Sequence, residues 1–311
     1  MRLDVQCRLS FIAQFETPAI LMLRPRSGWG QWVVREEYLL QPNISVVEYT
    51  DSFGNLCQRI VIPPGPFDIC ASASVETADS IDVQSDAPFI PVSELPVDVL
   101  QFLLPSRYCQ ADQPQIGSLA AKIVAGLKPS YAQVEAIRNW IQENIRYEYG
   151  TSNASTSALE TANQRVGVCR DFAHLGIALC RSLNIPARMV VGYLHELDPM
   201  DLHAWFEAYV GDQWYTFDAT QKQPKGNRVA IAYGRDAADV ALITQFGPME
   251  LTQMEVTVSP GTAPELEALE LEPLELESLE LDSLELKSLD LDSSDLQLQD
   301  LELQGLEPQA V

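Results

Sequence analysis

Three side chains whose types suit nucleophilic acyl transfer, a thiol, an imidazole and a carboxylate, occur in that order within residues 165–220. Cys169 lies in RVGVCRDFAHL, His203 in LHAWFEAYV and Asp218 in DQWYTFDAT. A thiolate attacks carbonyl carbons, an imidazole relays the proton, and a carboxylate orients the imidazole. The trio therefore predicts a cysteine-dependent catalytic site.

Each of these residues, taken alone, also has an ordinary structural explanation. A buried cysteine is most often an inert small hydrophobe, and a histidine at the start of a strand is more often structural than catalytic. The catalytic interpretation depends on whether the elements around the trio bring its members together.

The segment around Cys169 is predicted to be a helix that begins after Gly167, runs to about Leu183 and ends at Asn184. Cys169 then lies in the first turn, where the helix N-terminus favours a thiolate. The backbone N–H of Cys169 is free at a helix start and is the predicted oxyanion donor. Tyr147 is the candidate for a second donor.

Other polar residues near the trio receive structural interpretations. Asp171 falls in the first helical turn, where a carboxylate favours the helix dipole. His174 and Cys180 are interpreted as ordinary helix residues, and His195 is predicted to face solvent.

The Gly211-Asp212 pair predicts a two-residue hairpin turn between residues 203–210 and 213–220. With this turn, Asp218 lies opposite Trp205, and His203 and Asp218 become diagonal neighbours on one face, roughly 7–8 Å apart at the backbone. The pattern predicts that this face points toward the Cys169 helix and that the other face forms the core. That other face consists of Ala204, Phe206, Ala208, Val210, Tyr215, Phe217 and Ala219.

These segments resemble the bacterial transglutaminase-like superfamily over about residues 130–221. The matching motifs are Gly167-Val-Cys169-Arg-Asp171-Phe-Ala173-His174, Leu183-Asn-Ile185-Pro186-Ala187-Arg188, Gly192-Tyr193, His203-Ala-Trp205 and Trp214…Phe217-Asp218-Ala-Thr220. One departure is Ala219, where many relatives have proline. The resemblance implies a papain-like α+β core with Cys169, His203 and Asp218 in the catalytic roles, as in transglutaminase-like cysteine proteases and acyltransferases.

The expected activity is acyl transfer on peptide or carboxamide bonds through a thioester on Cys169. Water as acceptor makes the protein a hydrolase, a protease or amidase; an amine makes it a transamidase. We favour hydrolysis of a protein or peptide, because nothing in the sequence marks a lysine-binding channel. The alternative is a non-catalytic protein-interaction module that uses the same fold and the C-terminal tail. The proposed chemistry needs neither a metal nor an organic cofactor.

The charge of the chain is concentrated at its C-terminal end. Of the formal net charge of −24, −14 lies in residues 262–311, and the remaining 261 residues carry −10. A mildly acidic body argues against nucleic acid or an anionic membrane as a partner. We expect no membrane span and no secretory signal. Six widely spaced cysteines then indicate free thiols and a cytoplasmic location.

The sequence predicts three regions. Residues 1–85 contain short apolar runs separated by turn residues, which is typical of an antiparallel β-sandwich and resembles, weakly, the β-rich region that precedes the core in this family. Residues 86–261 comprise a proline-rich connector and the catalytic domain, with amphipathic helices at 116–127 and 131–145. Residues 262–311 form an acidic, leucine-rich tail.

Leucines recur in this tail as L-x-L with a period of five, for example at Leu274 and Leu276 and again at Leu279 and Leu281. Neither a helix nor a single strand gathers such a pattern on one face. Two interpretations stay open, a disordered segment and a short pentad-repeat coil. The tail is also the candidate segment for binding a protein partner.

Overall fold

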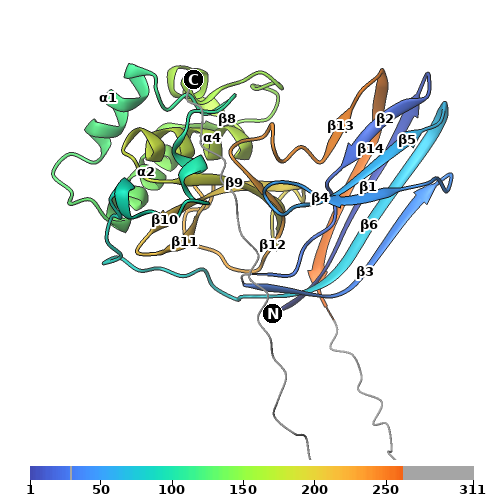
Figure 1. Cartoon of the computed structure of the whole chain (residues 1–311), viewed down its shortest axis with the longest axis horizontal. Coiled ribbons are helices and arrows are strands. Elements are labelled where there is room, and N and C mark those ends of the chain that lie inside the picture. Colours follow the sequence, from blue (N-terminus) through green and yellow to red (C-terminus); the bar gives the residue numbers. More distant parts are fainter. Residues whose placement is uncertain (29, 262–311) are drawn as a thin grey trace, which may run out of the picture. The chain divides into compact units, whose positions relative to one another are not determined.

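The computed structural model describes residues 1–28 and 30–261; the predicted tail lies outside them. The β-rich N-terminal region is confirmed, and its strands form two antiparallel four-stranded sheets (Figure 1). The first sheet has the order β14-β1-β6-β3, from Met249–Pro260, Arg2–Ala13, Gly65–Thr77 and Gln31–Gln41. The second has the order β13-β2-β5-β4, from Ile243–Gln245, Thr17–Leu21, Leu56–Ile62 and Val47–Thr50.

Buried and more exposed side chains alternate along the two central strands of the first sheet, as expected for strands with one face in the core. On β1 every second side chain is buried, namely Leu3, Val5, Cys7, Leu9 and Phe11. On β6 the buried side chains alternate with small or polar ones in the same way. Along much of β6 the buried positions hold small residues, such as Ala71 and Ala73.

The segment after residue 242 departs from the predicted division of the chain. The sequence analysis grouped residues up to 261 with the catalytic domain. By their hydrogen bonds, β13 and β14 instead belong to the β-rich sheets, where β14 pairs with β1 and β13 with β2. The catalytic region is therefore an insertion within a β-rich region that the two ends of the described chain build together.

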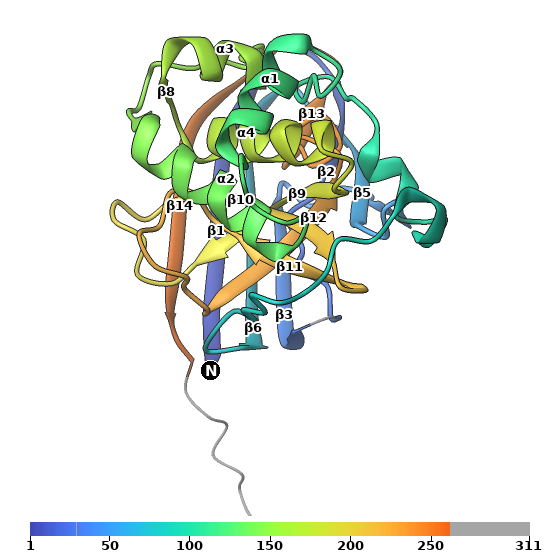
Figure 2. The same cartoon turned by 90° about the vertical axis from the view of Figure 1, so that its left-hand side faces the viewer.

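The catalytic region is a four-stranded antiparallel sheet covered by helices. Its order is β11-β10-β9-β12, from Gln213–Phe217, His203–Val210, Ala187–Leu194 and Arg228–Gly234. Helices α1 to α4 lie in front of this sheet in Figure 2. They span Pro114–Ile123, Tyr131–Asn144, Ala158–Gln164 and Cys169–Ser182. The connector that precedes them contains two short 3₁₀ helices, Val92–Glu94 and Leu100–Leu103.

The predicted helices at 116–127 and 131–145 correspond to α1 and α2, and the helix after Gly167 is α4. Helix α3 was not predicted. It begins with a capping box in which the Ser157 hydroxyl accepts from the Glu160 backbone and the Glu160 carboxylate accepts from the Ser157 backbone. This Ser-x-x-Glu spacing is a readable helix start that the analysis overlooked.

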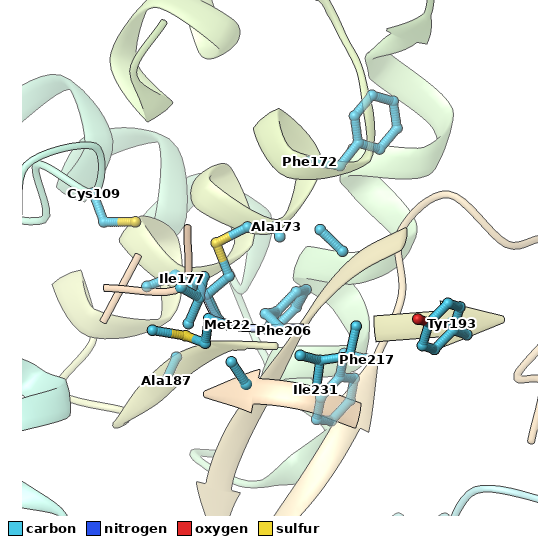
Figure 3. Packing of buried hydrophobic residues seen from close by; sticks show 14 of the residues in the cluster. Met22, Cys109, Phe172, Ala173, Ile177, Ala187, Tyr193, Phe206, Phe217 and Ile231 are labelled. Atoms are coloured by element: carbon cyan, nitrogen blue, oxygen red, sulfur yellow. The ribbon is translucent and has the colours of Figure 1, made fainter. Parts of the chain in front are cut away.

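Helix α4 is the central helix of the catalytic region, and each of its residues from Asp171 to Arg181 is buried. It packs against β10 so closely that a Cβ on Gly176 would lie 2.5 Å from the Phe206 ring. Phe206 stacks on Phe217 at 5.6 Å between ring centroids, within the same cluster as Ile177 (Figure 3).

Two polar side chains of the β-rich region hydrogen-bond to the backbone of β12. Gln31 donates to the Ala230 carbonyl at 2.9 Å and accepts from its N–H at 2.7 Å. Asn55, fully buried in the turn after Asp51, makes the same pair of bonds to Tyr233, each 2.8 Å. Each side-chain amide thus satisfies the backbone N–H and C=O of one β12 residue, as a neighbouring strand would.

Candidate active site

Each of the three predicted catalytic residues lies at the end of a regular element. Cys169 is the first residue of α4, His203 is the first residue of β10, and Asp218 directly follows β11. Such positions leave side chains less enclosed by their own element than interior positions do. Cys169 is partly exposed, whereas His203 and Asp218 are 3% and 5% exposed.

The hairpin that carries His203 and Asp218 has the predicted turn and register. Gly211 and Asp212 both have positive φ, 54° and 66°, as a two-residue hairpin turn of this kind requires. The strands pair from Val210 with Gln213 through to Phe206 with Phe217. The apolar face is buried as expected: Ala204, Phe206, Ala208, Val210, Tyr215, Phe217 and Ala219 are all at most 5% exposed.

One prediction about the hairpin is wrong. The face that bears His203 was expected to point toward the Cys169 helix, but the body of α4 packs against the opposite, apolar face through Gly176 and Phe206. An amphipathic helix buries its apolar side against the apolar side of a sheet, so the binary pattern favours this arrangement. The N-terminus of α4 alone reaches His203, at the point where β10 begins.

His203 and Asp218 form a buried hydrogen-bonded pair. The imidazole Nε2 lies 2.7 Å from Asp218 Oδ2. The other carboxylate oxygen, Oδ1, accepts from the Thr220 N–H at 2.9 Å and from its hydroxyl at 2.7 Å. Because Asp218 occupies Nε2, Nδ1 is the ring nitrogen left to exchange a proton with Cys169. The carboxylate thus fixes both the orientation and the tautomer of the ring.

Arg228 also binds this carboxylate and was missed by the sequence analysis. Its Nη2 lies 2.8 Å from Asp218 Oδ2, the oxygen that His203 also contacts. Arg228 is the first residue of β12, 7% exposed, and its guanidinium lies over the Trp205 ring, 5.0 Å from the centroid. An isolated arginine ten residues after Asp218, outside any motif, gives no sequence signal of this contact.

The charges of the site oppose the effect of burial. Burial disfavours the ionised carboxylate of Asp218, but the Arg228 guanidinium, followed by His203, holds its pKa well below the usual range. Burial likewise favours a neutral His203, yet the Asp218 carboxylate and Cys169 raise the pKa of the imidazole to about 9. His203 is therefore an imidazolium at neutral pH, hydrogen-bonded to an anion on one side and adjacent to the Cys169 thiol on the other.

Tyr147, the candidate second oxyanion donor, lies next to Cys169. It ends the short strand β7 (Arg146–Tyr147), which pairs in parallel with β8 (Val166–Gly167), so that Tyr147 is the partner of Gly167. Burial, and then the neighbouring Cys169 side chain, raise the pKa of the Tyr147 phenol well above its usual range. The phenol is thus neutral, and its oxygen lies beside the backbone of Cys169.

The remaining polar residues of the segment have structural contacts. Asp171 is fully buried and accepts from the Val168 N–H at 2.9 Å, which caps the start of α4 as expected. His174 is buried, stacks on Tyr108 and accepts from the Ala237 N–H at 3.1 Å. His195 is half-buried, although it was predicted to face solvent.

Within residues 1–28 and 30–261, no three His, Cys, Asp or Glu side chains are grouped so that they could bind a metal ion. No helix among these residues is long and apolar enough to cross a membrane.

Comparisons with known proteins agree with this fold. Residues 117–219 match the sequence profile of the transglutaminase-like superfamily. A crystal structure from Cytophaga hutchinsonii, of a protein described provisionally as a cysteine protease, aligns with a TM-score of 0.79 at 38% identity, covering 85% of this chain and 91% of that one. An uncharacterized protein of Mycobacterium leprae is 28% identical over 248 residues, which are 73% of this chain and 87% of the relative. The chain belongs to the transglutaminase-like superfamily.

Proposed function

We propose that this protein is a cysteine-dependent acyl transferase that hydrolyses peptide or carboxamide bonds of a protein or peptide substrate. The observation that carries the proposal is the buried His203–Asp218 hydrogen bond, 2.7 Å long, with the free side of the imidazole beside Cys169 at the N-terminus of α4. A thiol, a correctly oriented imidazole and a helix N-terminus together supply a nucleophile and its proton relay.

In the first half-reaction the Cys169 thiolate attacks the carbonyl carbon of the substrate and forms a C–S bond. The carbonyl oxygen becomes an oxyanion, for which the Cys169 N–H and the Tyr147 hydroxyl are the candidate donors. The C–N bond then breaks, and His203 Nδ1–H gives its proton to the departing amine. The products are a free amine, a thioester on Cys169 and a neutral His203.

In the second half-reaction His203 accepts a proton from water, and the resulting hydroxide attacks the thioester carbonyl. The C–S bond breaks, a carboxylic acid leaves, and the thiolate and imidazolium are restored. An amine in place of water would give a new amide by the same steps. We favour water because the protein from Cytophaga hutchinsonii, 38% identical, is described as a cysteine protease.

Selective alkylation tests whether Cys169 is an activated nucleophile. All six cysteines are free; four are buried, and Cys70 is partly exposed like Cys169. Iodoacetamide near pH 7 should label Cys169 at least tenfold faster than Cys70, because a thiolate reacts and a thiol does not. Cys169→Ala should remove both labelling and hydrolysis of a peptide library, whereas Cys70→Ala should change neither. Equal labelling of the two cysteines would refute the enzyme proposal.

The choice of acceptor needs a separate measurement. The enzyme should be given a glutamine-containing peptide with and without a millimolar primary amine, and the products separated by mass. Release of the free acid at an unchanged rate in the presence of the amine supports hydrolysis. A dominant amine-conjugated product would instead make the protein a transamidase. If Cys169→Ser abolished conversion of the peptide substrate but left the protein's role in the cell intact, the interaction-module alternative would hold.

A further inference from the structure

Arg228 contacts Asp218 directly, as His203 does, but its positive charge is permanent, and it is almost completely buried. Its Nη2 donates to Asp218 at 2.8 Å, its Nε donates to the Lys225 carbonyl at 2.9 Å, and its planar group covers the Trp205 ring. A buried cation is costly unless an anion compensates it. Asp218 provides that anion, and it also binds His203.

Arg228, Asp218, His203 and Cys169 form a continuous chain of charges. With Cys169 as thiolate and His203 as imidazolium, the chain holds two cations and two anions in alternation. Tyr147, beside Cys169, is neutral, and Lys225 contributes its backbone carbonyl. Arg170 and Asp171, which follow Cys169, form an ion pair with each other at 3.2 Å. The net charge of this buried group is therefore zero in the form that performs the chemistry.

Removal of the Arg228 charge would leave the group with two anions and one cation. In a medium of low dielectric constant the group would then bind a proton more tightly. Asp218 would still accept from the His203 imidazolium and from the N–H and hydroxyl of Thr220, and His203 already carries a proton, so the Cys169 thiolate is the site that takes it up. The cation at Arg228 thus favours the reactive thiolate although it does not touch the sulfur.

The β-rich region holds the segment of Arg228 in place. The Thr77 hydroxyl, at the end of β6, donates to the Arg228 carbonyl at 2.6 Å, and the Asn227 N–H donates to the Ala78 carbonyl at 2.8 Å. A Cβ on Gly226 would lie 2.2 Å from the Asp79 carbonyl carbon, so the two backbones are in direct contact. Arg228 is therefore held at two points. Its backbone is bonded to the β-rich region, and its guanidinium is bonded to Asp218.

We propose that Arg228 is a positioning residue of the active site, which keeps Asp218 anionic and balances the charge of the Cys169 thiolate–His203 imidazolium pair. This inference rests on the proposed function, because it presumes that Cys169 reacts as a thiolate. It adds a fourth residue to the site, contributed by a strand outside the hairpin.

The test is the pH dependence of Cys169 alkylation by iodoacetamide in the full chain, measured for Arg228→Met, Arg228→Gln and Arg228→Lys. Methionine and glutamine remove the charge, so the midpoint of the acidic limb should rise by about one pH unit and alkylation below it should slow about tenfold. Arg228→Lys keeps the positive charge, so the midpoint of Cys169 alkylation in this variant should stay within about 0.3 pH units of the wild type. Circular dichroism establishes that each variant is folded.

Arg181→Met is the matched control. Arg181 is 3% exposed and donates to the Ala187, Leu104 and Arg235 carbonyls, away from the site. Its loss should lower stability and leave the midpoint unchanged. An unchanged midpoint in both neutral variants of Arg228, an equal shift in Arg181→Met, or a full shift in Arg228→Lys would each overturn the inference. Failure of the proposed function is distinguishable, because Cys169 of the wild type would then show no selective labelling.

Discussion

His203 Nε2 lies 2.7 Å from Asp218 Oδ2, which leaves Nδ1 as the nitrogen that faces Cys169. The same carboxylate oxygen accepts from Arg228 at 2.8 Å. One buried oxygen atom thus couples the proton relay to a permanent positive charge.

The first prediction concerns stability as a function of pH. The pKa of His203 is raised from 6.5 to about 9 in the folded protein. A raised pKa means that the imidazolium stabilises the folded state fully below pH 6.5 and that this contribution disappears as the pH rises through 9. The expected size is about 3 kcal/mol. Urea unfolding of the wild type and His203→Gln should therefore show a difference that shrinks by about this amount between pH 6 and pH 10; a constant difference would contradict the prediction.

The second prediction concerns the carboxylate. Asp218→Asn keeps a side chain that can hydrogen-bond to the ring but removes the charge, and we expect kcat to fall by about 10²–10⁴-fold. The alkaline limb of the pH–rate profile should also move from near pH 9 toward neutrality, because the Asp218 carboxylate raises the pKa of His203. Asp212→Asn, in the exposed hairpin turn, is the control and should alter neither property.

The third prediction concerns Tyr147. If its hydroxyl donates to the oxyanion, Tyr147→Phe should lower kcat about 10- to 100-fold with little change in KM, since the bond forms mainly in the transition state. Tyr149 packs against Tyr147 with ring centroids 5.4 Å apart and is the natural comparison. Tyr149→Phe should stay within about twofold of the wild type. An equal loss in Tyr149→Phe would contradict a specific role for the Tyr147 hydroxyl.

The fourth prediction concerns the turn that aligns His203 with Asp218. Gly211 has φ +54°, and a Cβ there would lie 2.9 Å from Ala87 Cβ. Gly211→Ala should therefore lower the free energy of unfolding by about 1–2 kcal/mol. Gly117, in helix α1, has no atom within 4 Å of an added Cβ. Gly117→Ala should raise the free energy of unfolding by about 0.5–1 kcal/mol, and urea denaturation of both variants compares these opposite signs.

The hairpin and helix α4 could be predicted because their signals lie between residues that are close in sequence. The Gly211-Asp212 turn and the alternation beside it determine the hairpin register, because both act between neighbours in sequence. Helix α4 was readable from its start near Gly167 and its end at Asn184, which has φ +59°. Strand β6 has a weaker local signal, because its buried positions include Ala71 and Ala73, too small to stand out from the serines between them.

Contacts between distant strands could not be predicted. Arg228 reaches Asp218 because β12 lies beside β9, and that strand order follows from the whole sheet rather than from any local pattern. The side of the hairpin that α4 covers was predicted incorrectly, since the polar pair was assumed to face the helix that carries its partner. Pairing of β13 and β14 with the N-terminal strands has no local signal either, because pairing partners far apart in sequence are not encoded in periodicity.

The pairing of β14 with β1 has a consequence for how the protein folds. Leu3 pairs with Pro260. During synthesis β1 therefore leaves the ribosome long before β14, one of the two strands with which it pairs. The catalytic region is synthesised in between and can fold first. Closure of the β-rich sheet then requires contacts of very long sequence separation, and we expect it to be the slow step of folding.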